Sequence, residues 1–135
     1  MDLAQSFKKY LDIRQITYNY NAEDNTIIFI HNNWHLMFIY DKDDPTYFRL
    51  ALPRLEVINN NFTYDMIIAA VNTAANYKVV KPAIIGNDLW FIFESFVPEY
   101  DTSNAKLFDR AINILERTGA EWRSYRNNMT LSDNP

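Results

Sequence analysis

Apolar and polar residues along the chain follow first a helical spacing and then a strand spacing. Within residues 2–14 the apolar positions recur at i, i+4, i+7 and i+8, which predicts an amphipathic helix. From residue 16 the period changes to two, and polar stretches rich in Asn and Asp interrupt the apolar runs. The pattern therefore predicts an antiparallel meander. Its four strands are expected at residues 16–20, 26–31, 34–40 and 47–52.

The second half of the chain predicts another helix, a hairpin and a long final helix. The second helix is expected over residues 63–77, because Thr63 can cap its first amides and the alanines within it favour helix. Two strands follow at 78–85 and 88–97, and a last helix begins near residues 101–103. The predicted order is therefore α-β-β-β-β-α-β-β-α. This is an α+β fold in which helices pack on one face of an antiparallel β-sheet.

A single domain accounts for the whole length. The chain has 135 residues, of which 48% are hydrophobic and 16% aromatic, and this is enough material for one packed core. We expect the domain to span residues 1–126 and the polar stretch 127–135 to form a mobile C-terminal tail. Gly119 falls inside the last helix or at its end, and the pattern leaves both open.

Charge and composition exclude several classes of protein. The net charge of −4, from 13 Lys and Arg against 17 Asp and Glu, lacks the basic footprint of a nucleic-acid binder. Cysteine is absent, which excludes disulfides, thiolate metal sites and a cysteine nucleophile. No run approaches the roughly 20 apolar residues of a membrane-spanning helix, and the N-terminal stretch does not resemble a signal peptide. We therefore expect a cytoplasmic protein that binds neither nucleic acid nor membrane.

Few residues suggest catalysis or metal binding. His31 and His35 are four apart, a spacing that binds zinc on a helix, but here they flank a predicted turn and have no third ligand. Glu94 lies among aromatic residues that could raise its pKa, but an ion pair with Arg49 or Lys81 is the simpler interpretation. We therefore expect no enzymatic activity, no metal and no cofactor.

Two of the predicted strands are apolar on both faces. One is the stretch DLWFIFESFV at residues 88–97, and the other is the strand at 34–40. One face of each strand should pack on the helices, so the other needs a cover of its own. That cover is either the chain itself, through curled sheet ends or the connection at 53–62, or a second subunit or client protein. Under the second hypothesis the expected contact residues are Trp34, Phe38, Trp90, Ile92 and Phe96.

The order of elements and several local stretches resemble a known family. These stretches are the meander with acidic turns, the segment AAVNTAANYKVVKPAII, the aspartate that opens the strand of GNDLWFIFESFV, and the long final helix. Together they cover roughly residues 3–126 and resemble the YbjN-type bacterial regulators, whose fold is similar to that of type III secretion chaperones. The resemblance implies a small bacterial cytoplasmic protein, commonly dimeric, that acts by binding other proteins. Secretion chaperones of this fold hold an extended segment of a client against their sheet and hydrophobic grooves.

We therefore expect a non-catalytic protein-binding protein, chaperone-like or a regulatory adaptor, that forms a homodimer. An alternative from another class is a small ligand-binding or enzymatic protein with an enclosed pocket. That alternative requires His35, Asp88 or Glu94 to lie deep in the pocket with a displaced pKa. An adaptor specific for one partner would instead show an acidic face, and the acidic turn at 41–44 is the place to look for it.

Overall fold

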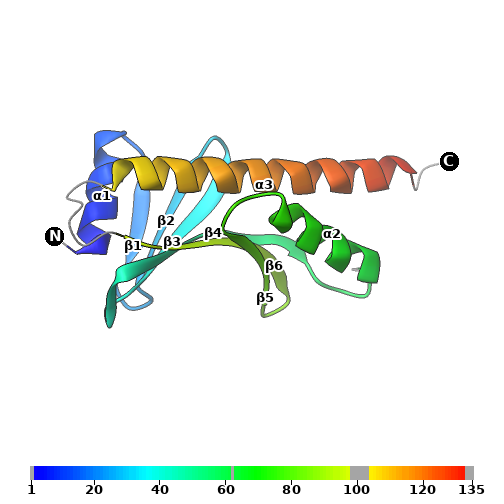
Figure 1. Ribbon diagram of the computed structural model, residues 1–135, viewed down its shortest axis with the longest axis horizontal. Coiled ribbons are helices and arrows are strands. Elements are labelled where there is room, and N and C mark those ends of the chain that lie inside the picture. Colours follow the sequence, from blue (N-terminus) through cyan, green and yellow to red (C-terminus); the bar gives the residue numbers. More distant parts are fainter. Residues whose placement is uncertain (1, 62, 98–103, 133–135) are drawn as a thin grey trace.

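The computed structural model describes residues 2–61, 63–97 and 104–132, and its elements follow the predicted order (Figure 1). The α+β fold class expected from the sequence is therefore confirmed. In chain order the elements are α1 (Leu3–Ile13), β1 (Tyr18–Asn21), β2 (Thr26–His31), β3 (Trp34–Asp41), β4 (Asp44–Val57), α2 (Tyr64–Ala75), β5 (Val80–Ile85), β6 (Asp88–Phe96) and α3 (Ala105–Ser132).

One antiparallel sheet carries the whole fold. Its strand order is β1-β2-β3-β4-β6-β5, so α2 and β5 lie in the connection between two strands that pair with each other. The three helices lie on one face of the sheet: α3 crosses its middle, and α1 and α2 lie toward its two ends (Figure 1). No helix in the described parts of the chain lies against the other face, which we call the open face.

Two of the helices begin at side-chain caps. The side chain of Asp2 accepts a hydrogen bond from the Gln5 amide at 2.8 Å, and the Gln5 side chain accepts one from the Asp2 amide at 3.1 Å. This reciprocal capping box starts α1. Thr63 caps α2 as the sequence predicted, since its hydroxyl accepts a hydrogen bond from the Met66 amide at 3.3 Å.

Turn chemistry sets the register of the meander. Asn32 and Asn33 both have positive φ, 51° and 66°, which asparagine tolerates in a two-residue hairpin turn. The turn that they form places His31 of β2 directly opposite Trp34 of β3. The fourth strand is longer than the predicted 47–52, because β4 continues through Pro53 by means of a bulge. Arg54 lies at this bulge with a φ of 54°.

The last helix is also longer than the pattern indicated. Residues 127–132, assigned to a tail from the sequence, continue α3 as far as Ser132, and residues 133–135 lie outside the described residues. Gly119 lies within α3 and does not end it. A methyl group added at Gly119 would lie 2.7 Å from Cη2 and from Cζ3 of Trp34, so this glycine allows α3 to lie close to the sheet here.

The core between the helices and the sheet is rich in aromatic rings. Phe7 of α1 stacks on Phe38 of β3 at a centroid distance of 4.0 Å, and Phe108 of α3 meets Phe7 edge-on at 4.9 Å. Phe48 extends the cluster across β4. All four side chains are buried. The two helices are thus joined to the middle of the sheet by one aromatic cluster.

Candidate protein-binding surfaces

Helix α2 is apolar on two faces, although only one of them packs against the rest of the chain. The inner face buries Met66, Ala70 and Ala74, whose small alanine side chains let the helix lie close to the sheet. The outer face carries apolar residues at i, i+3, i+4 and i+7, the spacing of a second helical stripe. Its members are Tyr64, Ile67, Ile68 and Val71, and Tyr64 is 74% exposed.

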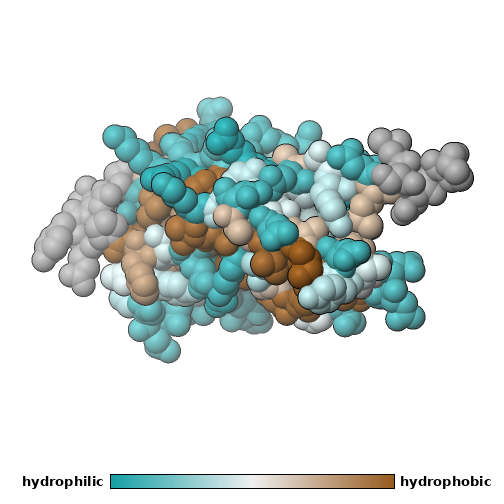
Figure 2. All heavy atoms as spheres, turned by 45° about the vertical axis from the view of Figure 1, so that its right-hand side comes forward, coloured by the Kyte–Doolittle hydropathy of each residue, from teal (hydrophilic) through white to brown (hydrophobic). Residues whose placement is uncertain are grey.

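The edge strand β5 continues this apolar stripe. Ile84 of β5 is 59% exposed, and an apolar groove of about 240 Å³ runs between it and Ile67 and Val71 of α2. Figure 2 shows hydrophobic side chains gathered at the end of the molecule that carries α2. We name the exposed set Tyr64, Ile67, Ile68, Val71 and Ile84 the α2–β5 surface.

Pairing of a further strand onto the free edge of β5 is partly blocked. Pro82 lies within β5 and has no amide hydrogen to donate. Proline on an edge strand is one of the features that discourage sheet extension. The apolar side chains of the α2–β5 surface are therefore the feature of this edge that offers a contact to a partner.

The open face of the sheet carries the residues that the sequence singled out in β6, but it covers two of them itself. Trp90 is 7% exposed and Ile92 is 2% exposed. Ala51 lies between them in a small apolar cluster, against which side chains of β3 and β5 pack. Only Phe96, 68% exposed beside Tyr47, projects freely. The β6 part of this face is therefore largely closed by its own neighbours, whereas Ile28 and Ile30 of β2 on the same face stay 40% and 54% exposed.

Two buried donors on the open face have no acceptor. The indole nitrogen of Trp90 and Nε of Arg49 are both buried, and neither finds a hydrogen-bond partner within the described residues. Arg49 lies opposite Glu94 in the β4–β6 register, so both donors lie on the same face. Unsatisfied buried donors are costly, but neither nitrogen is exposed, so a polypeptide on the open face reaches them only if their side chains first move.

Trp34 and Phe38, which the sequence analysis placed with Trp90, lie on the helix-covered face. Phe38 is fully buried against Phe7 of α1. The Trp34 ring packs beneath α3, where the guanidinium of Arg123 lies 3.7 Å from the ring centroid. The assignment was wrong because it used the alternation within each strand alone. Which face is shared between β3 and β6 depends on their registers with β4, and these follow from distant pairings.

Glu94 belongs to a polar cluster on the open face. Its carboxylate forms an ion pair with Lys81 and accepts a hydrogen bond from the Tyr47 hydroxyl, which confirms the ion pair expected from the sequence. The Lys81 contact, followed by the Tyr47 contact, lowers the pKa of Glu94. Burial and the bond to Glu94 raise the pKa of Tyr47 to about 12. Glu94 is thus an ionised partner at neutral pH and is not poised as a general acid.

The other titratable residues considered from the sequence lie apart from one another. His31 pairs with Glu116 of α3, His35 is exposed, and Asp88 lies 3.9 Å from Arg54. Among the described residues, no group of three or more His, Asp or Glu lies close enough together to hold a metal ion. None of the described helices is long and apolar enough to cross a membrane. The enclosed-pocket alternative required His35, Asp88 or Glu94 to lie deep in a pocket, but His35 is exposed and the other two are partly exposed.

Comparisons with known proteins identify the fold. No family model matches the sequence, and no curated protein matches it by sequence. The structure is similar to YbjN from E. coli, described as a candidate transcription regulator, with a TM-score of 0.69 and 7% identity over 93% of this chain and 92% of that one. It is also similar to a chain of the HopA1–SchA chaperone–effector complex, with a TM-score of 0.63 and 12% identity over 92% of this chain and 98% of that one.

At these identities the likeness concerns the fold and leaves function to be argued from the surfaces. Both similarities extend over more than nine-tenths of this chain. The chain therefore has the α+β fold of YbjN and of the secretion chaperones, as its sequence indicated.

Proposed function

We propose that this chain is a non-catalytic, cytoplasmic protein-binding protein that pairs with a second copy through the α2–β5 surface. The observation that carries the proposal is the second apolar stripe of α2. That stripe plays no part in the chain's own core, because Met66, Ala70 and Ala74 already pack α2 against the sheet. A contiguous apolar stripe left on a helix and the adjacent edge strand is typical of a protein interface.

A second copy fits this surface by symmetry. In a two-fold dimer the same patch meets itself, and an elongated apolar stripe is complementary to its own copy. Five roughly half-exposed side chains at about 1 kcal/mol each, counted in both copies, amount to about 10 kcal/mol. If association costs about 4 kcal/mol, about 6 kcal/mol remains, which corresponds to a dissociation constant of about 10–100 µM. A dilution series can reach that range.

The open face is where we place client binding. One structural neighbour comes from a chaperone–effector complex, and the fold is the same here. The exposed ring of Phe96 offers a polypeptide an apolar contact on this face. A chaperone-like or adaptor role follows from this arrangement, with the dimer and the client on different sides of the chain.

The test is the molar mass in solution, measured by light scattering over a dilution series. The wild type is compared with Ile67→Glu on the α2–β5 surface, with Phe96→Glu on the open face and with Ile13→Glu at the exposed end of α1. Ile13 is 68% exposed and matches Phe96 in exposure while lying outside both surfaces. Circular dichroism of each variant checks that the fold is kept.

We expect the wild type to approach the dimer mass at high concentration and Ile67→Glu to remain a monomer. The variants at Phe96 and Ile13 should behave as the wild type does. A wild type that stays monomeric well above 100 µM would overturn the dimer, since it exceeds the range of about 10–100 µM estimated above. Dissociation by Phe96→Glu in place of Ile67→Glu would move the contact to the open face.

A further inference from the structure

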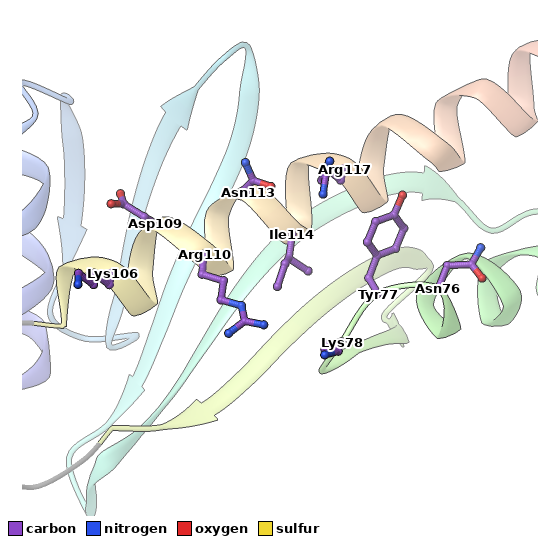
Figure 3. A pocket seen from close by; sticks show the side chains of 9 residues that line it. All are labelled: Asn76, Tyr77, Lys78, Lys106, Asp109, Arg110, Asn113, Ile114 and Arg117. Carbon is purple, nitrogen blue, oxygen red and sulfur yellow. The ribbon is translucent and has the colours of Figure 1, made fainter.

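A basic hollow lies between α3 and the connection that follows α2. It is a shallow depression that is widely open to solvent, with a volume of about 560 Å³. One wall is a stripe along α3 at i, i+4, i+7 and i+11, formed by Lys106, Arg110, Asn113 and Arg117. The opposite wall is the segment 76–78, and Figure 3 shows the side chains of both walls around the space between them.

The hollow concentrates positive charge in a chain that is negative overall. Four of the 13 basic residues of the chain line it, against a net charge of −4. Within the described residues these four form no ion pair, and all four are exposed; they are Lys78, Lys106, Arg110 and Arg117. Asp109 is the acidic residue of the lining, and its carboxylate already accepts hydrogen bonds from Tyr10 and Arg14.

Neutral donors complete the lining. Asn113 lines the hollow from α3, and the Tyr77 ring stands on the other wall, between Asn76 and Lys78 (Figure 3). Burial, followed by the charge of Glu121, raises the pKa of Tyr77, so its hydroxyl stays protonated and can donate. Asn76 closes one end by donating to Glu121 at 3.1 Å. The hollow therefore presents donors and cations with little competing acceptor charge.

We propose that this hollow binds an acidic segment of an extended polypeptide from a partner protein. The length of the basic stripe favours such a ligand. From Lys106 to Arg117 the helix rises about 16 Å at about 1.5 Å per residue, which matches about five residues of extended chain at about 3.3 Å each. Lys106 and Arg110 are about 6 Å apart along the axis, close to the spacing of alternate side chains in an extended peptide.

Shape and overall charge disfavour other anions. A single phosphate is too small to reach from Lys106 to Arg117 along this stripe. A nucleic acid would extend past both ends of the hollow into the field of a protein with a net charge of −4, which repels it. A short acidic stretch within a polypeptide meets the cations without that cost. The proposal rests on the protein-binding function above but does not require the α2–β5 dimer.

The experiment titrates the protein into a fluorescein-labelled hexapeptide of alternating Glu and Ser and follows fluorescence anisotropy. A peptide with Gln in place of Glu and a six-residue oligothymidylate are the comparison probes. The variants are Arg110→Gln, Arg117→Gln and their double variant. The matched control is Lys42→Gln, which removes one positive charge from the exposed β3–β4 turn, outside the hollow.

We expect saturable binding of the Glu peptide, weakened about threefold by each single variant and about tenfold by the double variant. The Lys42→Gln variant should bind the Glu peptide as tightly as the wild type does. The Gln peptide should not bind to the wild type. Ile67→Glu should keep peptide binding, which separates failure of the dimer from failure of the hollow. No saturable binding up to about 1 mM protein, equal losses in Lys42→Gln, or tighter binding of the oligothymidylate would each overturn the proposal.

Discussion

Gly119 offers a sharp test of how α3 packs on the sheet, through the substitution Gly119→Ala. Alanine is a better helix former than glycine by about 0.8–1.0 kcal/mol, so an unhindered position would gain stability. At this position the new methyl group would lie 2.7 Å from two ring carbons of Trp34 and 2.9 Å from Cδ1 of Leu52. Carbon atoms in contact prefer about 3.5–4.0 Å, so α3 or the Trp34 ring must move by about 1 Å.

The two effects oppose each other, and overpacking should exceed helix propensity. Forcing an extra methyl into a close-packed contact costs about 1–3 kcal/mol. Subtracting the propensity gain leaves a net destabilisation of about 1 kcal/mol. Changing the neighbour gives a sharper test, because Trp34→Phe removes the two ring carbons that the methyl would meet. The contact that remains is with Cδ1 at the far end of the Leu52 side chain, which can shift at little cost. In that background Gly119→Ala should stabilise the protein by up to about 1 kcal/mol.

The assay is urea unfolding at one fixed protein concentration, with the free energy of unfolding compared within each background. Ala120→Gly serves as the local control, because Ala120 is exposed on the same helix. The decrease in the free energy of unfolding of this variant, expected at about 1 kcal/mol, measures helix propensity alone. The reasoning predicts a change of sign between the two backgrounds and a coupling energy of about 2 kcal/mol. A gain of about 1 kcal/mol from Gly119→Ala in the wild type would refute the close approach of α3.

Two further predictions concern the core and the open face. Phe7→Ala should lower the free energy of unfolding by about 3–5 kcal/mol, because the fully buried ring contacts Phe38 and Phe108. Urea unfolding measures this loss. Phe7→Leu, which keeps most of the apolar volume, should lower the free energy of unfolding clearly less. The second prediction concerns Glu94, whose pKa in the folded protein lies below the ordinary value of 4.5. Its ion pair with Lys81 therefore stabilises the fold above about pH 4.5. This stabilisation is lost as the pH falls through the folded pKa. Glu94→Gln should therefore cost less than about 1 kcal/mol at pH 7, because both side chains are partly exposed, and less than that at pH 3. An equal loss at both pH values would mean that Glu94 acts through packing and not through its charge.

Local patterns were sufficient to predict the order of elements. The change of period from helix to strand, the Asn-rich turns and the Thr63 cap are all encoded within a few residues of where they act. The limits of β4 were missed because proline ordinarily ends a strand. Here the bulge at Arg54 lets the strand continue to Val57. Whether such a bulge forms depends on the partner strand, which the local sequence does not show.

The candidate surfaces were only partly predictable. Trp90, Ile92 and Phe96 were placed on the correct face, but their exposure depends on neighbours contributed by β3, β4 and β5. The α2–β5 surface was missed although its signal was present. Apolar residues recur at helical spacing from Tyr64 to Val71, on a different face from the alanines. A helix that is apolar on two faces needs a packing partner for each of them. The basic hollow joins side chains of α3 to the segment 76–78, which no local pattern brings together.

The strand order has a consequence for how the chain reaches its fold. Strands β1 to β4 pair through short turns, so the meander can form early from local contacts. The pairing of β4 with β6 is different, because even its nearest partners, Val57 and Asp88, enclose the whole of α2 and β5. Closing that loop costs chain entropy before the contacts compensate for it. We therefore expect docking of β6 onto β4 to limit the folding rate, and the inner face of α2, with Met66, Ala70 and Ala74, to stay exposed to neighbouring chains until docking is complete.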